Sequence, residues 1–209
     1  MSELPSAPRL GRIRPATFPD ETQHARQRGG VRSGEIVVLD RALTADECGM
    51  VRAFVRRTER EALRLRFGQA ADFADDSTLK RFFGIKDKIG EMIWMLDEDE
   101  AVGGILHRVL ISPTQAEIAV IVRSDRARRG IGRALLRTAV SRAASQDLKR
   151  LSALVLSENV VMLRLARSLG FAPRKSFGLA VELELDLDLD LGQTIGCSTG
   201  TASAPIVST

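Results

Sequence analysis

The sequence predicts an α/β fold in which helices flank a central sheet of mixed, mostly antiparallel direction. Segments with a strand-like apolar pattern alternate with segments whose apolar residues recur at helical spacing. In the middle of the chain short turns join three strands, which makes them antiparallel. Later a helix separates two strands and allows them to run parallel. The chain has 209 residues and is 44% hydrophobic, which is enough for one domain with its own core.

Composition divides the chain into three parts. Residues 1–34 are rich in Pro, Gly and Arg and have no apolar period, so we expect a flexible N-terminal arm. Residues 35–191 contain the periodic segments and form the predicted domain. Residues 192–209 are rich in Gly, Ser and Thr, which is typical of a disordered tail.

The domain is predicted to begin with one strand and three helices. Glu35–Leu43 contains an apolar run typical of a strand. Thr44–Glu47 and Thr58–Glu61 both fit a capping box, in which a hydroxyl and a carboxylate bind free backbone N–H groups, so each should begin a helix. A third helix is predicted over Asp75–Phe83, with Ser77 as a candidate cap.

Three strands joined by turns are predicted next. They cover Met92–Leu96, Ala101–Ile111 and Ala116–Val122. The acidic run Asp97–Glu100 lies between the first two. We interpret it as a solvated hairpin turn without a function.

Two helices and two strands are predicted to complete the domain. Apolar residues at helical spacing follow Gly130, and Gly170 is placed to end the second helix. Strict alternation of apolar and acidic residues predicts a last strand with one buried face. The remaining three elements are expected at Leu151–Leu156 (strand), Val160–Leu169 (helix) and Ala180–Leu191 (last strand).

Composition argues against several classes of protein. The net charge is +4, but the arginines are scattered among acidic residues and aromatic residues make up 4%, so no nucleic-acid surface is predicted. The two cysteines, Cys48 and Cys197, are far apart and form no metal or disulfide pattern. We find no secretory signal and no apolar run of about 18 residues, and therefore expect no membrane span and a cytoplasmic protein.

The segment Val122–Leu136 carries the clearest chemical signal. A strand ends, a basic loop with Gly130 and Gly132 follows, and a helix begins. A helix N-terminus offers unpaired N–H groups and a positive dipole end, so this arrangement is suited to a pyrophosphate. It matches neither the P-loop nor the dinucleotide fingerprint, and a tight helix start without a ligand is the alternative. Three side chains add positive charge to the loop: Arg126, Arg128 and Arg129.

A second segment supports the first. LSALVLSENVVMLRLARSLGFAP reads as a strand followed by Asn159, Met162, Leu165 and then Leu169–Phe171. Together the two blocks resemble the GNAT family of N-acetyltransferases, over about residues 35–191. The resemblance implies the GNAT fold, an N-acetyltransferase activity and acetyl-CoA as co-substrate, without a metal.

The resemblance also implies a set of coenzyme contacts. The strand over 119–122 is expected to splay from its neighbour and to offer backbone groups to the pantetheine arm. Asn159 is expected to reach the coenzyme and is also a candidate helix N-cap. Ala127 departs from the family, which usually has Gln or Arg there. The implied contacts are Ala119, Val120, Ile121, Val122, Arg126, Arg128, Arg129, Gly130, Ile131, Gly132, Arg133 and Asn159.

A closer resemblance suggests the chemistry. TADECGMVRAFVRRTEREALRLRFG and AEIAVIVRSD resemble the GNAT domain of Pat-type protein lysine acetyltransferases. This resemblance implies that Glu117 is the general base, and we expect burial to raise its pKa. The alternative is that Glu117 is only the polar start of a strand. The chain has no Tyr, and Ala166 stands where many GNAT enzymes have a Tyr acid.

Three functions remain open at this point. The first is acetylation of a protein lysine, for which an acyl-CoA synthetase is one candidate acceptor. The second is acetylation of a small-molecule amine. The third is a non-catalytic sensor that binds acetyl-CoA. His107 is interpreted as a packed or exposed strand residue rather than a catalytic one.

Overall fold

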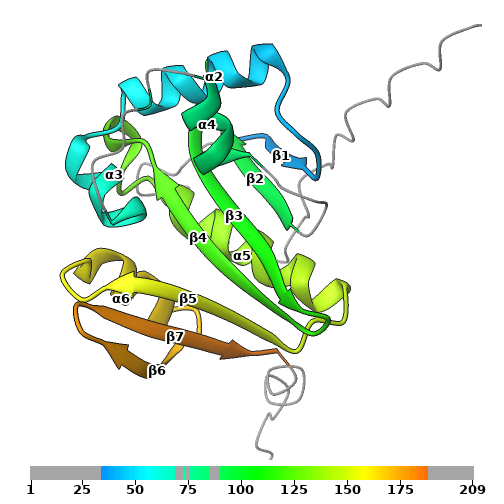
Figure 1. Cartoon of the computed structure of the whole chain (residues 1–209), viewed down its shortest axis with the longest axis vertical. Coiled ribbons are helices and arrows are strands. Elements are labelled where there is room, and N and C mark those ends of the chain that lie inside the picture. The colour runs from blue at the N-terminus through cyan, green and yellow to red at the C-terminus, as the bar shows by residue number, and fades with distance from the viewer. Residues whose placement is uncertain (1–33, 69–72, 74–75, 85–89, 188–209) are drawn as a thin grey trace, which may run out of the picture.

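A seven-stranded sheet forms the centre of the described part of the chain, in the order β1-β2-β3-β4-β5-β7-β6 (Figure 1). The computed structural model describes residues 34–68, 73, 76–84 and 90–187. A mixed sheet with flanking helices confirms the predicted α/β class. The strands are β1 (Ile36–Leu39), β2 (Gly90–Leu96), β3 (Val102–Ser112), β4 (Gln115–Val122), β5 (Arg150–Leu156), β6 (Ala172–Phe177) and β7 (Ala180–Asp186).

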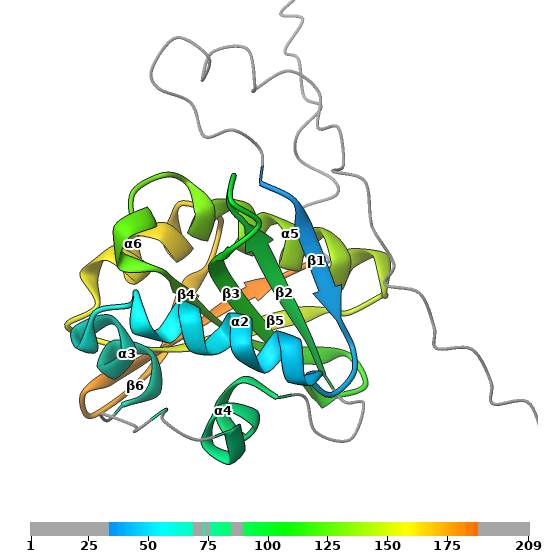
Figure 2. The same cartoon turned by 90° about the horizontal axis from the view of Figure 1, so that it is seen from above.

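Helices cover both faces of this sheet, as the view from above shows (Figure 2). One face carries α2 (Ala45–Arg56), α3 (Arg60–Phe67) and α4 (Asp76–Phe83). The opposite face carries α5 (Ile131–Ser145) and α6 (Val160–Arg167). None of the helices in the described ranges is both long and apolar enough to cross a membrane.

Strand direction follows from the connections. Strands β1 to β4 are antiparallel neighbours, and α5 crosses over between β4 and β5, which are parallel. Strand β7 lies between β5 and β6 and is antiparallel to both. The expected antiparallel group and the expected parallel step are therefore both confirmed.

Alternation along the strands builds a separate apolar core on each face. The core under α5 and α6 includes Leu106, Leu136 and Leu151, which are inaccessible to solvent. The core under α2 and α4 includes Phe83 and Ile105, also inaccessible. Strand β3 contributes neighbouring residues to both cores and so connects the packing on the two faces of the sheet.

The helix starts differ in how well the sequence predicts them. The first capping box is present: Glu47 N donates to Thr44 Oγ1 at 3.3 Å, and Thr44 N donates to the Glu47 carboxylate at 2.7 Å. The second predicted capping box, at Thr58–Glu61, is wrong. Thr58 Oγ1 donates backward to Phe54 O at 2.8 Å, and Glu59 caps α3 without a side-chain bond. The cap predicted at Ser77 is also wrong, because this residue lies inside α4.

The C-terminal strands also differ from the prediction. Strand β6 is missing from the predicted order, because all of its residues are exposed and show no apolar alternation. The last strand ends at Asp186, and the continuation of its predicted range from residue 188 lies outside the described residues. The predicted arm, apart from Gly34, and the predicted tail over 192–209 also lie outside them.

A buried cluster of three charges joins the sheet to α5. Glu91 on β2 lies opposite Arg108 on β3, with 3.1 Å between Arg108 Nε and Glu91 Oε1. Arg142 on α5 reaches the same carboxylate, with 2.6 Å between its Nη2 and Glu91 Oε2. The side chains of Glu91 and Arg108 are each 6% exposed. One carboxylate therefore balances two guanidinium groups where water has little access.

We predict that Glu91→Gln lowers the free energy of unfolding by about 3–5 kcal/mol, because it leaves two guanidinium groups without their shared anion. Urea unfolding followed by circular dichroism measures this loss. Glu158→Gln is the matched control, because it removes a carboxylate from the exposed pair with Arg64 and should cost much less. Equal losses in the two variants would contradict the assignment.

Candidate functional site

Strands β4 and β5 separate part of the way along their length. Their parallel pairing covers Gln115 with Arg150, Ala116 with Leu151, and then Glu117 with Ser152. Beyond that point β4 stays paired with β3 but no longer with β5. Figure 1 shows the two strands diverging toward α3 and α6. The expected splay over residues 119–122 is confirmed, and the backbone of β4 on that side has no strand partner.

A cleft of about 460 Å³ occupies the opening between the two strands. Its walls are the end of α3, β4 from Glu117 to Val122, β5 from Ala153 to Leu156, and the first turn of α6. Most of the lining is apolar, as in typical ligand sites. Among the described residues that line it, two are titratable, Arg66 and Glu117.

The loop after β4 turns sharply and directs the start of α5 toward this cleft. Gly130 has a φ of 82°, in the left-handed region that favours glycine, and Arg128 has a φ of 60°. A non-glycine residue held there marks a backbone constrained by its surroundings. Helix α5 begins at Ile131, so its first N–H groups have no intrahelical acceptor. Gly132 lines the cleft. The first turn of α5 therefore suits the binding of an anion in the cleft.

Two glycines allow the close packing that fixes this helix start. A Cβ on Gly104 of β3 would lie 2.6 Å from Ile131 Cγ2, closer than atoms can pack. A Cβ on Gly132 would lie 3.1 Å from Leu165 Cδ2 of α6. The first turn of α5 therefore lies directly on the sheet and against α6.

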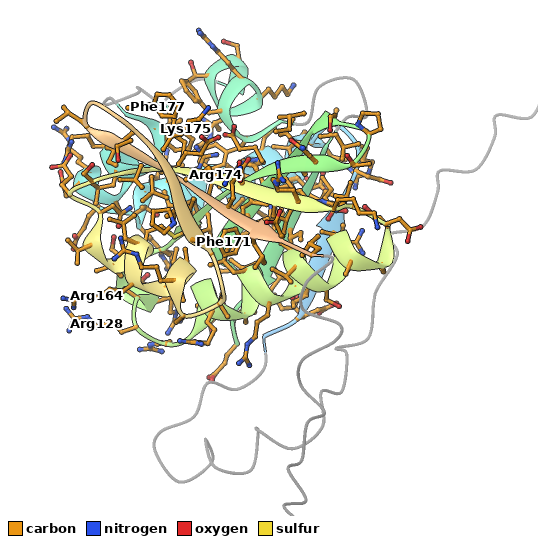
Figure 3. All side chains as sticks on the ribbon, turned by 90° about the horizontal axis from the view of Figure 1, so that it is seen from below. Arg128, Arg164, Phe171, Arg174, Lys175 and Phe177 are labelled. Carbon is orange, nitrogen blue, oxygen red and sulfur yellow. The ribbon has the colours of Figure 1, made fainter. Side chains whose placement is uncertain are left out.

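The predicted arginines of the loop have different surroundings. Arg126 contacts Asp97, with 3.1 Å between its Nη2 and Asp97 Oδ2. Arg133 donates from Nη2 to Ser168 Oγ at 3.0 Å. Arg128 and Arg129 are exposed, and no partner is found for them among the described residues. Figure 3 shows the Arg128 side chain projecting from the surface. These last two remain available to an anion.

Asp97 has a structural role that was not predicted from the sequence. Its side chain is 7% exposed, and Arg123 Nη2 lies 2.7 Å from its Oδ2. It also accepts hydrogen bonds from the backbone N–H of Asp99 and Ala101. The interpretation of the acidic run as a solvated turn is therefore wrong for Asp97. The carboxylate joins the β2–β3 turn to Arg123 at the end of β4, just before the loop.

Electrostatics favour the charged form of this carboxylate. Burial alone would raise its pKa. The N–H groups of Ala101 and Asp99 and the guanidinium of Arg123 outweigh that cost, so the pKa of Asp97 is lowered. The C-terminal end of β4 is thus anchored by a buried ion pair.

Glu117 is the last residue of β4 that is paired with β5, at the point where these two strands separate. It faces Val109 on β3 and Ser152 on β5, and it lines the cleft. The neighbouring Ile118 is buried on the opposite face. Glu117 itself is exposed, so the burial expected for it is not found.

His107 lies on the same face of the sheet but inside the core, 8% exposed. Burial, with the nearby charge of Arg66 acting in the same direction, lowers the pKa of His107 to about 3. The imidazole is therefore neutral at physiological pH. This state agrees with the interpretation of His107 as a packed residue.

Asn159 caps α6 and also borders the cleft. Its Oδ1 accepts a hydrogen bond from Met162 N at 3.1 Å, which confirms the N-cap interpretation. Because the residue also lines the cleft, a contact with a ligand is geometrically compatible with the cap. Ala166, about two turns further on, is 1% exposed and packs in the core.

The β6–β7 hairpin lies beyond β5 in the sheet, and its residues Arg174, Lys175 and Phe177 are labelled in Figure 3. All three are exposed, and Arg174 Nε lies 3.1 Å from Glu184 Oε2. Among the described residues, no three His, Cys, Asp or Glu side chains are grouped to hold a metal ion.

Comparison with known proteins gives consistent matches. The model of the acetyltransferase (GNAT) family matches residues 53–171. The structure is similar to the GNAT domain of PAT from S. lividans, with a TM-score of 0.63 and 22% identity over 73% of this chain and 91% of that one.

Two further solved structures share the architecture. A spermidine N-acetyltransferase from Vibrio cholerae, in complex with CoA and spermine, has a TM-score of 0.59 and 16% identity over 73% of this chain and 96% of that one. A phosphinothricin acetyltransferase from Sinorhizobium meliloti, in complex with AcCoA, has a TM-score of 0.58 and 17% identity over 74% and 89%. At these identities the likeness is one of fold.

We predict that Asp97→Asn destabilises the protein by about 3 kcal/mol at pH 7, because Arg123 loses its buried counter-ion. Since the folded pKa of Asp97 lies below its unfolded value, its contribution is complete above about pH 4 and is lost as the pH falls through the folded pKa. As the pH falls below about 4, the variant should therefore lose less stability than the parent.

Denaturant unfolding at a series of pH values measures both effects. Asp125→Asn is the control, because Asp125 contacts the same Arg123 but its side chain is 51% exposed. We expect this variant to cost less than about 1 kcal/mol. An acid dependence in Asp97→Asn as steep as that of the parent would refute the buried pair as its source.

Proposed function

Because this chain belongs to the GNAT family of acetyltransferases, we propose that it transfers an acetyl group to the ε-amino group of a protein lysine, with Glu117 as general base. The family match covers more than half of the chain. The protein is thus an N-acetyltransferase with acetyl-CoA as its co-substrate. The observation that carries the proposed chemistry is the position of Glu117, at the point where β4 leaves β5 and the cleft begins.

The residues around the cleft fit the coenzyme. Backbone groups of Ala119, Val120, Ile121 and Val122, free of β5, are proposed to pair with the pantetheine amides. Backbone N–H groups at Gly130, Ile131, Gly132 and Arg133 are proposed to hold the pyrophosphate. Asn159 is proposed to contact the coenzyme from α6.

The three loop arginines are proposed to contribute to phosphate binding in different ways. Arg128 and Arg129 supply positive charge to the phosphates, because they are exposed and without partners among the described residues. Arg126 contributes mainly through its backbone, because its guanidinium is held by Asp97. Recognition through backbone N–H groups also explains why Ala127 is compatible with the site.

The proposed reaction assigns one step to each group. Acetyl-CoA supplies the acetyl group as a thioester. Glu117 accepts a proton from the acceptor ammonium, directly or through a water, and the free amine attacks the carbonyl carbon. A backbone N–H of β4 donates to the carbonyl oxygen and stabilises the charge that develops there. A C–N bond replaces the C–S bond, and the attacking nitrogen loses its second proton. The thiolate, whose conjugate acid has a pKa of about 8.5, takes up that proton without a Tyr.

The acceptor assignment rests on three observations. The segments around the early helices and β4 resemble those of Pat-type lysine acetyltransferases, and the fold is similar to the GNAT domain of PAT from S. lividans. The cleft offers a single described carboxylate, Glu117, beside the cation Arg66, which suits one ammonium group better than a polycation. An acyl-CoA synthetase is a candidate acceptor.

The second candidate function is acetylation of a small-molecule amine. It is favoured by the shared fold with enzymes described as spermidine and phosphinothricin acetyltransferases. A non-catalytic acetyl-CoA sensor is a third and weaker alternative. The proposal also includes a cytoplasmic location, where Cys48 would stay reduced.

We predict that Glu117→Gln lowers kcat about 100-fold or more and leaves acetyl-CoA affinity within about twofold, because the amide keeps the shape of the side chain but cannot accept the proton. A thiol reagent that detects released CoA gives the rate, and calorimetry gives the affinity. An unchanged rate would remove Glu117 from the proposed role.

The acceptor is tested by incubating the protein with labelled acetyl-CoA and two panels. One contains folded proteins, including acyl-CoA synthetases, and the other contains polyamines, amino acids and amino-acid analogues. We expect Glu117-dependent acetyl-lysine, located by mass spectrometry, in the protein panel. Turnover confined to the amine panel would replace the lysine proposal with its alternative. Binding of acetyl-CoA without turnover in either panel would favour the sensor.

A further inference from the structure

The outer half of the sheet is open on the face that carries Glu117. The apolar core under α2, α3 and α4 takes its strand residues from β1 to β4 and, among the described residues, none from β5, β6 or β7. Figure 1 looks onto this face, and no described helix lies in front of β5 or β7. Their opposite face is covered, because Leu151 and Leu183 lie in the core under α5 and α6. The sheet therefore presents one uncovered face that begins beside Glu117.

The strand register shows which side chains share this face with Glu117. Residues that pair directly in neighbouring strands point to the same side of a sheet. Val109 of β3 and Ser152 of β5 both pair with Glu117. Leu154 follows Ser152 by two residues and so points to the same side. Glu117 thus lies between Val109 on one neighbouring strand and Leu154 on the other.

The edge strand adds an aromatic ring to the same face. Leu156 of β5 pairs with Ala180 of β7, and Ala180 pairs in turn with Phe177 of β6. Leu156 follows Leu154 by two residues, so all of these side chains lie on the face of Glu117. Because Leu156 and Ala180 line the cleft, Phe177 lies one strand beyond the cleft wall.

Three large apolar side chains on this face are exposed to solvent. Val109 is 42% exposed, Leu154 59% and Phe177 56%. Single exposed apolar residues are normal on a protein surface, whereas a group of them on one uncovered face is typical of a binding surface. We call these three residues the apolar flanks of the cleft.

Strand β7 brings three carboxylates to this face, and each has a cation beside it. Opposite charges on neighbouring strands attract each other. The pairs are Glu182 with Lys175 (opposite in the strand register), Glu184 with Arg174 (3.1 Å, Oε2 to Nε) and Asp186 with Arg150 (2.9 Å, Oδ1 to Nε). These carboxylates are therefore already balanced.

Glu117 differs from the carboxylates of β7. The strand positions that face it hold Val109 and Ser152, neither of which is charged. Arg66 lines the same cleft, but its Nη2 lies 3.4 Å from His107 Nδ1, and no hydrogen bond joins it to Glu117 among the described residues. The charge of Glu117 is thus available to an incoming ammonium group, and its surroundings on the sheet are apolar.

We propose that this open face, with its apolar flanks, is the docking surface of the acceptor polypeptide, and that it favours a lysine with apolar residues on both sides in the sequence. The lysine ammonium binds Glu117, and the apolar neighbours of the lysine pack on Val109, Leu154 and Phe177. This role rests on the proposed function and specifies the kind of sequence that the enzyme acetylates.

The spacing of the flanks fits an extended peptide that crosses the strands. Adjacent strands lie about 4.8 Å apart, and an extended chain advances about 3.4 Å per residue. Strand β6 lies three strands beyond β4, so Phe177 is at least about 14 Å from β4, the length of about four residues. Val109 and Leu154 lie on the strands next to β4. They are placed for residues close to the lysine, and Phe177 is placed for a residue further along the peptide.

The open face also favours a polypeptide over a small amine. Removing apolar side chains from water is favourable, and a polypeptide covers the flanks when its lysine reaches Glu117. A small amine leaves them in water. A polyamine carries further cations, for which the described lining of the cleft offers no second carboxylate.

The test uses two short synthetic peptides of equal length and charge, each with one lysine. The first has Leu on both sides of the lysine and Phe about four positions away; in the second these residues are Ser. Both are assayed with acetyl-CoA and the variants Val109→Ser, Leu154→Ser and Phe177→Ser. Leu110→Ser is the matched control, because Leu110 is also an exposed residue of β3 but pairs with Ala116 on the opposite face.

We expect the parent to have a KM about tenfold lower for the apolar-flanked peptide, with kcat within about twofold for the two peptides. Each of the three variants should raise that lower KM about three- to fivefold, and should have a smaller effect on the serine-flanked peptide. Leu110→Ser should match the parent. Urea unfolding confirms that each variant is folded, and calorimetry with acetyl-CoA confirms that Val109→Ser and Phe177→Ser still bind the coenzyme.

Several outcomes would overturn this docking surface. Equal KM values for the two peptides, with normal turnover of both, would remove it and leave the lysine proposal standing. A loss in Leu110→Ser as large as that in Val109→Ser would show that the effect does not belong to this face. Turnover of small amines without turnover of any peptide would refute the proposed function as well.

A second copy of the chain is the other occupant that the experiment must exclude. Light scattering gives the molar mass of the parent and of Phe177→Ser. We expect the same mass for both. A parent dimer that Phe177→Ser converts to a monomer would assign this face to an interface between copies and overturn its role in acceptor docking.

Discussion

The organisation of the site depends on how short the parallel pairing between β4 and β5 is. Three residue pairs join the strands, and the rest of β4 remains bound to β3 on its other side. The cleft, the unpaired backbone over 119–122 and the position of Glu117 all follow from this separation. The loop after β4 leads directly into α5, so the N-terminus of that helix lies at the open end. Ligand sites in open α/β sheets commonly occupy such a place, at the carboxyl ends of strands where the order changes.

Two buried ion clusters keep the open geometry in place. Near the paired end, Glu91 binds Arg108 and Arg142 and so attaches the last part of α5 to β2 and β3. Near the open end, Asp97 binds Arg123 and attaches the end of β4 to the β2–β3 turn. Between them α5 lies flat on the sheet, because Gly104 leaves room for its first turn. The loop is therefore presented by supports that lie outside the cleft itself.

Whether a feature could be predicted from the sequence depends on how far along the chain its stabilising partner lies. Local patterns were sufficient for the alternating strands, for the capping box at Thr44 and for the loop before α5. Local patterns failed where a side chain binds a partner outside its own segment. Thr58 donates to the preceding helix instead of capping the next one, and Asp97 is buried by Arg123, 26 residues later in the chain.

Strand β6 and the site residues illustrate the same limit. The sequence APRKSF has no apolar face, and it becomes a strand because β7 offers an edge to pair with. The position of Glu117 was predictable from its segment, but its exposure depends on the separation of β5. The contact of Arg66 with His107 joins residues 41 positions apart, so no local sequence pattern predicts it.

The exposed strand β6 also affects how the molecule behaves in concentrated solution. A sheet can recruit foreign strands at its two outer edges, and such recruitment leads to aggregation. One edge of the described sheet, β1, is four residues long. The other, β6, contains Pro173, which lacks an N–H, an irregular register between Pro173 and Lys175, and two adjacent cations. Shortness at one edge, and proline, charge and irregular register at the other, oppose fibril-like stacking of the protein even though Phe177 is exposed.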